Sequence, residues 1–327
     1  AGRQFRGDMS DTIKLPEYAL EAIDLRKTYR GGGKAPDKEA LRGIDLKVKR
    51  GSFFGLLGPN GAGKSTFINI FAGLTNKTSG TARTWGVDID QDSRAARAAI
   101  GVVPQEISAD VFFTPYETLE LMAGFYGVPK NERRTDELLE VLGLSDKRDA
   151  YVRQLSGGMK RRLLVAKAMV HTPPVLVLDE PTAGVDIELR KQLWTFVREL
   201  HTKGTTIVLT THYLEEAQEL CDEIAIIDQG RVIACEPKET LLRRMDKKTL
   251  VITPGEALAA VPASLDGLDA EIRPDGSLAI SYRFGEVSVA EMIERFHASG
   301  ARIADLRTEE ADLEDVFLSL TYHREDA

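Results

Sequence analysis

The chain of 327 residues is long enough for two domains, and its 43% hydrophobic and 29% charged residues are typical of a globular protein. The formal net charge of −8 belongs entirely to residues 236–327, which hold 11 Lys and Arg against 19 Asp and Glu. A neutral body with an acidic end lacks the basic face that nucleic acid requires, so we expect no nucleic-acid partner.

The start of the chain, AGRQFRGDMS, lacks an initiating Met, so we expect residues 1–15 to be a tag remnant and a flexible N-terminus. No apolar run reaches the roughly 20 residues of a membrane-spanning helix. Cys221 and Cys235 fit neither a metal-ligand spacing nor a CxxC pattern, which favours reduced thiols in the cytosol. Any role at a membrane must therefore depend on a partner.

Two kinds of strand are predicted in the first two thirds of the chain. Residues 18–25 and 39–48 alternate apolar and polar side chains, as half-buried antiparallel strands do. Short, continuous apolar runs then occur at 53–57, 100–103, 175–178 and 206–210. Strands buried on both faces have this pattern, so these runs predict a parallel α/β sheet. Helical spacing of apolar residues over roughly 106–172 predicts a helical insert in that α/β core.

The last third of the chain has a different character. Strand-like segments joined by tight turns, the helix-like SVAEMIERFHASG, a further strand and a final helix follow one another. We therefore expect residues 236–327 to form a separate, small α+β domain. Its role is left open between dimer contact, regulation and a purely structural cap.

The stretch GPNGAGKS, from Gly58 to Ser65, matches the phosphate-loop pattern G-x-x-x-x-G-K-[ST] and lies between an apolar strand and the helix-like STFINIFAGL. Backbone N–H groups of such a loop surround a β-phosphate, and the helix N-terminus adds its dipole. Lys64 would neutralise the β- and γ-phosphates, and Ser65 would ligate Mg²⁺. The predicted nucleotide-binding residues of this loop are Gly58, Pro59, Asn60, Gly61, Ala62, Gly63, Lys64, Ser65 and Thr66.

A pair of acids, Asp179 and Glu180, ends the buried strand in VLVLDE. Alone, such a pair more often caps a helix. Beside a phosphate loop, Asp179 suits a Mg²⁺ ligand and Glu180 suits a base that orients or deprotonates the attacking water. NKTS at 76–79 lacks the carboxylate that a guanine-reading motif needs, so ATP is the expected nucleotide.

The order of these motifs resembles the ATP-binding subunit of ABC transporters over residues 16–235, with an α/β fold built from a mixed sheet, an antiparallel β subdomain and the helical insert. The resemblance implies that Gln105 in VVPQE is a lid glutamine that senses Mg²⁺ and the water. His212 in LTTHY would contact the γ-phosphate, Asp186 would belong to an intersubunit loop, and Tyr29 would stack on adenine. The family signature is LSGG, formed by Leu155, Ser156, Gly157 and Gly158.

In this family two cassettes pair head to tail, and the signature of one closes over the nucleotide held by the other. The resemblance therefore implies a homodimer with two Mg-ATP and two competent sites. Met159 and Lys160 follow the signature glycines where many members have Gln, a variant familiar in ABC-2-type exporters, so we expect hydrolysis to survive.

The same resemblance implies a separate transmembrane permease, which would hold the chain at the cytoplasmic face of the inner (plasma) membrane. Val111, Phe112 and Phe113 are candidates for a groove that grips this permease, or are core of the helical insert. The alternatives to an exporter ATPase are a soluble ABC-type clamp and an inactive interaction module. The stretch from Lys64 to Ser156 is too short for the coiled-coil arm of many clamps, and the filled catalytic set argues against inactivity.

Overall fold

The structure, a computed structural model, describes residues 15–32, 36–106, 110–182, 187–244, 247–283, 287–310 and 313–322. Backbone contacts divide the chain into two compact units. The first comprises Ala1–His212 and Ala225–Cys235, and the second comprises Tyr213–Ile224 and Glu236–Ala327. In the ranges that the structure describes, no helix combines the length and the apolar character needed to cross a membrane.

A six-stranded sheet with the order β10-β9-β3-β8-β7-β6 forms the centre of the first unit. Its strands are β3 (Phe53–Leu57), β6 (Ile100–Val103), β7 (Val175–Asp179), β8 (Thr206–Thr210), β9 (Glu223–Asp228) and β10 (Arg231–Pro237). The pairs β3–β8, β7–β8 and β6–β7 are parallel, and every residue of β3, β7 and β8 is buried. The predicted parallel strands are thus confirmed. Because they run in one direction, their carboxyl ends meet at one edge of the sheet.

A four-stranded antiparallel sheet, in the order β2-β1-β4-β5, forms a second layer of this unit. Its strands are β1 (Tyr18–Tyr29), β2 (Lys38–Lys49), β4 (Ser79–Thr84) and β5 (Val87–Asp88). The antiparallel pairing of β1 with β2 confirms the two predicted strands, which are longer than their sequence patterns. The hairpin of β4 and β5 is an addition that the sequence patterns do not predict.

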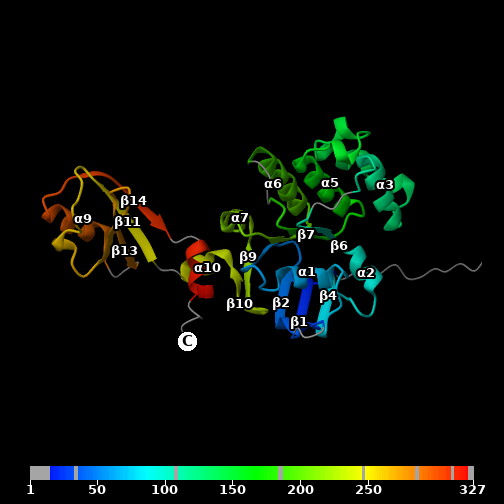
Figure 1. The fold of residues 1–327 in the computed structure, drawn as a ribbon, viewed down its shortest axis with the longest axis horizontal. Coiled ribbons are helices and arrows are strands. Elements are labelled where there is room, and N and C mark those ends of the chain that lie inside the picture. The colour runs from blue at the N-terminus through cyan, green and yellow to red at the C-terminus, as the bar shows by residue number, and fades with distance from the viewer. Residues whose placement is uncertain are drawn as a thin grey trace, which may run out of the picture. The chain divides into compact units, whose positions relative to one another are not determined.

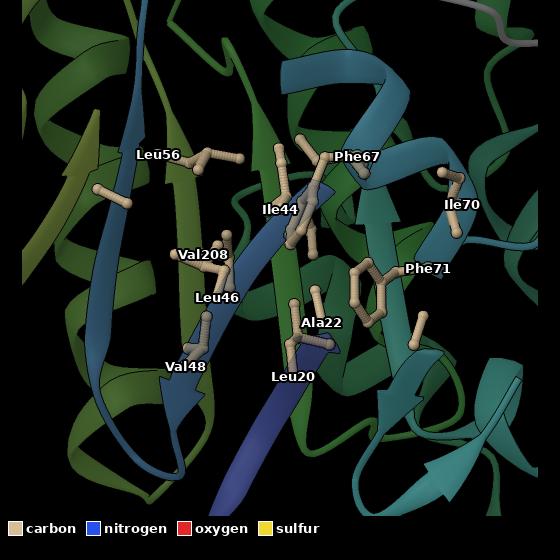
Figure 2. Close-up of a cluster of buried hydrophobic side chains, with 14 of the residues drawn as sticks. Leu20, Ala22, Ile44, Leu46, Val48, Leu56, Phe67, Ile70, Phe71 and Val208 are labelled. Atoms are coloured by element: carbon tan, nitrogen blue, oxygen red, sulfur yellow. The ribbon is translucent and has the colours of Figure 1, made fainter. Parts of the chain in front are cut away.

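One hydrophobic core joins the two sheets through helix α1 (Lys64–Phe71). Figure 2 shows Leu46 of the antiparallel sheet close to Val208 of the parallel sheet, and both belong to the same buried cluster as Phe71 of α1. The Phe67 and Phe71 ring centroids are 4.8 Å apart, and both rings are 1% exposed. Burial of aromatic rings of this size contributes strongly to stability, so α1 is held firmly at the end of β3.

The remaining helices of the first unit are α2 (Ser93–Ala98), α3 (Pro115–Phe125), α4 (Thr135–Val141), α5 (Gly157–Met169) and α6 (Ile187–Thr202), with 3₁₀ turns at Lys130–Glu132, Ser145–Lys147 and Val152–Gln154. Helices α3, α4 and α5 form the predicted helical insert, which is confirmed. Helices α3 and α4 both contact α5, and Figure 1 shows α3 near α5. Thr114 and Glu117 form a reciprocal capping box at the start of α3, with Pro115 at its first position, and this fixes where α3 begins.

The second unit contains an antiparallel sheet in the order β12-β13-β11-β14. Its elements are α7 (Leu214–Leu220), α8 (Lys238–Arg244), β11 (Lys247–Pro254), a 3₁₀ turn (Ala263–Leu265), β12 (Asp269–Ile272), β13 (Leu278–Arg283), α9 (Val289–Ala298), β14 (Ile303–Glu310) and α10 (Leu313–Tyr322). Met292 and Phe296 of α9 are fully buried against Leu250 and Ile280 of the sheet, which Figure 1 shows beside α9. Helix α10 contacts α7 and α8, and the backbone N–H of Leu313 donates to Gln218 Oε1 at 3.0 Å.

Candidate active site

The phosphate loop connects β3 to α1 by a backbone path that two of its glycines make possible. Gly58 has φ +155° and Gly63 has φ +114°. A Cβ on Gly58 would lie 2.1 Å from the carbonyl oxygen of Ile227, and one on Gly63 would lie 2.8 Å from that of Ala40. Only glycine combines these backbone angles with so close an approach of neighbouring backbone. The pattern of the loop is therefore fixed by sterics as well as by its phosphate chemistry.

Lys64, the first residue of α1, is only 8% exposed. Its Nζ donates to the carbonyl oxygens of Gly58 at 2.6 Å and Pro59 at 3.2 Å, which holds the ammonium group inside the loop. Burial lowers the pKa of Lys64, while the negative charges of Glu180 and Asp179 act in the opposite direction. The ammonium group and both acids therefore belong to one electrostatic site.

A pocket of about 210 Å³ opens over this loop. It is lined by Asn60 to Thr66 of the loop and by Tyr29, Lys38, Ala40, Gln105 and Glu180. Tyr29 ends β1 and is 39% exposed, with its hydroxyl 3.5 Å from Thr66 Oγ1. Lys27 Nζ lies 4.7 Å from the centroid of this ring. The structure thus brings Tyr29, the phosphate loop, Gln105 and Glu180 to one pocket.

Asp179 ends β7 and is 8% exposed. The register of the sheet places it beside Thr210, the last residue of β8, and the Thr210 hydroxyl donates to Asp179 Oδ1 at 2.5 Å. A buried carboxylate is stable only when hydrogen-bonded or paired, and the Thr210 hydroxyl supplies such a hydrogen bond to Asp179. The sequence patterns do not single out Thr210. Its only sequence signal is its place at the end of a buried strand that precedes His212.

Glu180 has an unusual backbone conformation for a non-glycine residue, with φ +48°. Its N–H donates to both Thr210 O at 3.0 Å and Thr210 Oγ1 at 3.1 Å, so the neighbouring strand holds this conformation in place. Strained backbone of this kind clusters at functional sites. It turns the Glu180 side chain, which is 12% exposed, toward the end of the sheet.

Two residues that lie far from Glu180 in the sequence meet at its carboxylate. Gln105 Nε2 donates to Glu180 Oε2 at 2.7 Å, and His212 Nδ1 lies 3.5 Å from the same oxygen. Gln105 follows β6 and His212 follows β8, and these two strands are the direct neighbours of β7 in the sheet. We call Gln105, Glu180 and His212, the candidate catalytic residues, the catalytic trio. A carboxylate that faces an amide and an imidazole is suited to accept a proton from water and to orient it.

The signature segment Leu155–Gly158 lies at the start of α5. Leu155 is buried, whereas Ser156 and Gly157 are exposed. Ser156 caps the helix, because its Oγ accepts from the N–H of Met159 at 3.3 Å. Exposed backbone N–H groups at a helix start form an anion-binding surface. None of these four residues lines the pocket over the phosphate loop, and Asp186 lies outside the described residues.

Comparisons with known proteins give consistent matches. Residues 41–183 match the family model described as ABC transporter. The Nod factor export ATP-binding protein I of Ralstonia nicotianae is 38% identical over 305 residues, which cover 92% of this chain and 93% of that protein. The daunorubicin/doxorubicin resistance ATP-binding protein DrrA of Streptomyces peucetius is 38% identical over 323 residues, which cover 95% of this chain and 94% of that protein.

A solved dimeric structure of an ATP-binding cassette, in a post-hydrolysis state with ADP and Pi, is similar to about two thirds of this chain. The TM-score is 0.61 at 28% sequence identity, and the match covers 67% of this chain and 98% of that one. The fold class expected from the sequence is confirmed by this likeness.

Proposed function

Since the chain belongs to the ABC transporter family and is an ATPase of that family, we propose that it is the ATP-hydrolysing subunit of an ABC-2-type exporter. Two copies pair head to tail around two Mg-ATP, and hydrolysis drives export of a substrate through a separate membrane permease. The permease holds the chain at the cytoplasmic face of the membrane. The observation that carries this proposal is the meeting of Gln105, Glu180 and His212 beside a complete phosphate loop.

Each residue of the site has a distinct role in this proposal. Lys64 and the loop N–H groups bind the β- and γ-phosphates, and Tyr29 stacks on adenine. Glu180 accepts a proton from the attacking water, which Gln105 and His212 help to orient. Phosphoryl transfer depends on positioning and charge neutralisation more than on covalent chemistry, which suits a site built from strand ends.

The residues present fit a Mg²⁺ ion. Ser65, Gln105 and Asp179 offer hydroxyl, amide and carboxylate oxygens, the hard ligands that Mg²⁺ prefers. Among the residues that the structure describes, no three His, Cys, Asp or Glu side chains gather as a metal site. Mg²⁺ usually keeps waters and substrate phosphate oxygens in its shell, so a single buried carboxylate is sufficient here. When bound, the ion would neutralise charge on the β- and γ-phosphates.

The exposed signature supports the head-to-tail dimer. Ser156 and Gly157 present a hydroxyl and N–H groups to solvent, away from the lining of the chain's own pocket. A similar solved cassette is a dimer with ADP and Pi. The second phosphate-binding surface of each chain therefore serves the ATP of its partner.

A mostly apolar groove of about 300 Å³ in the first unit supports docking of a permease. Its lining includes Leu74, Val102, Met122, Tyr126 and Leu164. Grooves of this kind bind amphipathic helices through apolar anchors. The relatives from Ralstonia nicotianae and Streptomyces peucetius carry export and drug resistance in their names, which favours an exporter over a soluble clamp.

Val111, Phe112 and Phe113 do not line this groove. They are 41%, 73% and 37% exposed, so they are not ordinary core of the helical insert. A role in permease binding stays a proposal for these three residues.

The proposal is tested by two measurements on the full chain. Purified protein should hydrolyse ATP with Mg²⁺ and lose this activity in EDTA and in Lys64→Ala. When the chain is co-expressed with a candidate ABC-2-type permease that co-purifies with the wild type, Leu74→Glu should lose co-purification. Val141→Glu, at an exposed position on α4, should keep it. Absence of Mg-dependent hydrolysis would refute the ATPase role, and unchanged co-purification of Leu74→Glu would refute docking at this groove.

A further inference from the structure

Arg161 is a buried cation that the roles above do not use. It lies on α5, the helix that begins at the signature, and is only 3% exposed. Its NH1 donates to the carbonyl oxygen of Pro104 at 2.8 Å. Pro104 directly precedes Gln105, so this hydrogen bond joins the signature helix to the backbone of the lid glutamine.

The surroundings of Arg161 indicate that its burial is unfavourable for the stability of the fold. Its Nε is buried and has no hydrogen-bond partner among the residues that the structure describes. Burial lowers the pKa of Arg161, while the negative charges of Asp179 and Glu180 act in the opposite direction. A buried, incompletely paired arginine is less favourable than an apolar residue of similar size, so stability alone does not explain it.

We propose that Arg161 is a positioning residue that couples the signature helix to the catalytic trio of its own chain. The helix that begins at Ser156 carries Arg161, and Arg161 holds the backbone beside Gln105, which donates to Glu180. Movement of α5, when Ser156 binds the partner's nucleotide, thereby shifts Gln105 relative to Glu180. Each chain aligns its own water for hydrolysis only when its signature is engaged. This inference rests on the proposed ATP hydrolysis at this site.

The adjacent Arg162 provides a matched control. Its NH1 donates to the carbonyl oxygens of Leu142 at 2.6 Å and Gly143 at 3.2 Å, just beyond the end of α4. Both arginines lie on α5, and each donates to backbone carbonyl oxygens of another segment. In the described part of the chain, the Arg161 hydrogen bond reaches the backbone before Gln105, whereas the two Arg162 hydrogen bonds reach the end of α4. A purely structural role of Arg161 predicts similar losses of activity for the two substitutions, and a positioning role predicts a larger loss for Arg161.

The experiment compares Arg161→Gln, Arg161→Lys and Arg162→Gln in the full chain with Mg-ATP. We expect Arg161→Gln to lower kcat by about tenfold with KM for ATP changed less than about twofold, because positioning rather than binding is lost. Arg161→Lys keeps one donor and the charge, and should recover part of the loss. Arg162→Gln should keep kcat within about twofold of wild type. The melting temperature of Arg161→Gln should be no lower than that of Arg162→Gln, because a buried charge has been removed.

A double-mutant cycle with Gln105→Ala identifies the route of the effect. If Arg161 acts through Gln105, the double variant hydrolyses ATP no more slowly than Gln105→Ala alone. Additive losses, equal kcat in Arg161→Gln and wild type, or an equal loss in Arg162→Gln would overturn the inference. An inactive wild type would instead overturn the proposed function. Should Arg161→Gln not fold, Arg161→Lys in the same cycle gives the same decision.

Discussion

The Thr210 hydroxyl donates to the Asp179 carboxylate at 2.5 Å, and Thr210 also accepts the N–H of Glu180 through its carbonyl oxygen and its Oγ1. One residue of β8 therefore holds Asp179, the last residue of β7, and Glu180, which follows it. The arrangement depends on the register that places Asp179 beside Thr210. This arrangement explains how the buried carboxylate of Asp179 can be followed directly by Glu180, whose backbone is in the left-handed conformation.

Thr210→Val should lower the free energy of unfolding by about 1–2 kcal/mol and kcat by about tenfold, because Asp179 loses a donor and Glu180 one acceptor. Thr206→Val is the control. Thr206 lies in the same strand, is equally buried, and accepts from the N–H of Gly51 at 2.9 Å at the other end of β8. The Thr206→Val variant should be less stable than wild type but equally active. Urea unfolding and a steady-state ATPase assay measure both effects, and a Thr206→Val enzyme as slow as Thr210→Val would contradict this account.

Glu180→Gln should lower ATP turnover by at least about 100-fold, because an amide cannot accept the proton of the attacking water. ATP binding should persist, so the variant should accumulate as an ATP-bound dimer visible by light scattering in Mg-ATP. Glu140→Gln, at an exposed position of α4, should behave as wild type. A Glu180→Gln protein that stays monomeric in saturating Mg-ATP would count against ATP as the link between subunits.

Two glycines of the phosphate loop should differ in their tolerance of alanine. A Cβ on Gly63 would lie 2.8 Å from both Ala40 O and Leu41 Cδ2, whereas one on Gly61, which also has positive φ, has no atom within 4 Å. We expect Gly63→Ala to lower the free energy of unfolding by about 2–3 kcal/mol and Gly61→Ala by about 1 kcal/mol. Urea unfolding without nucleotide measures the difference, and equal losses would be inconsistent with the close approach at Gly63.

His171 should make stability depend on pH. Its ring stacks on Tyr126 with centroids 3.6 Å apart, and burial lowers the pKa of His171 to about 4. The unfolded chain binds this proton below about pH 6.5, whereas the folded chain does so only near pH 4, so acid favours unfolding across this window. As the pH falls from 7.5 to 5, the titration of His171 should lower the free energy of unfolding by about 2 kcal/mol.

The variant His171→Phe keeps an aromatic ring against Tyr126 without the titrating nitrogen. Its free energy of unfolding should therefore fall less steeply than that of wild type between pH 7.5 and pH 5. Urea unfolding at several pH values gives both slopes. Parallel curves would show that His171 does not titrate in this window.

Much of the site could be predicted because its chemistry follows continuous patterns along the chain. The buried strand before Gly58 and the one that ends at Asp179 are continuous apolar runs, and parallel strands bring such ends together. The β4–β5 hairpin and helix α2 could not be predicted in this way. Strand β5 has two residues and α2 has six, too few to show a period.

Other parts of the site depend on contacts between distant segments. In the sequence, Thr210 resembles any β-branched residue of a strand, and its role follows only from its register with Asp179. Arg161 stands in a run of three basic residues, which ordinarily indicates a solvated face. Its burial arises because the backbone before Gln105 packs on α5. Local patterns carry no information on either contact.

The claim on which the account depends is that each ATP is enclosed by the phosphate loop of one chain and the signature of another. Ser156→Phe should block hydrolysis while leaving ATP binding intact, and Lys64→Ala should impair the chain's own phosphate loop. Neither variant should be active alone. In an equal mixture, half of the dimers are mixed, and each of these contains one site with an intact Lys64 from one chain and an intact Ser156 from the other.

The decisive measurement is therefore the ATPase activity of the 1:1 mixture of Ser156→Phe and Lys64→Ala. Recovery to about one quarter of the wild-type rate is the result that shared sites predict. Activity that stays at the level of the separate variants, although mixed dimers form, would contradict enclosure of the nucleotide between two chains.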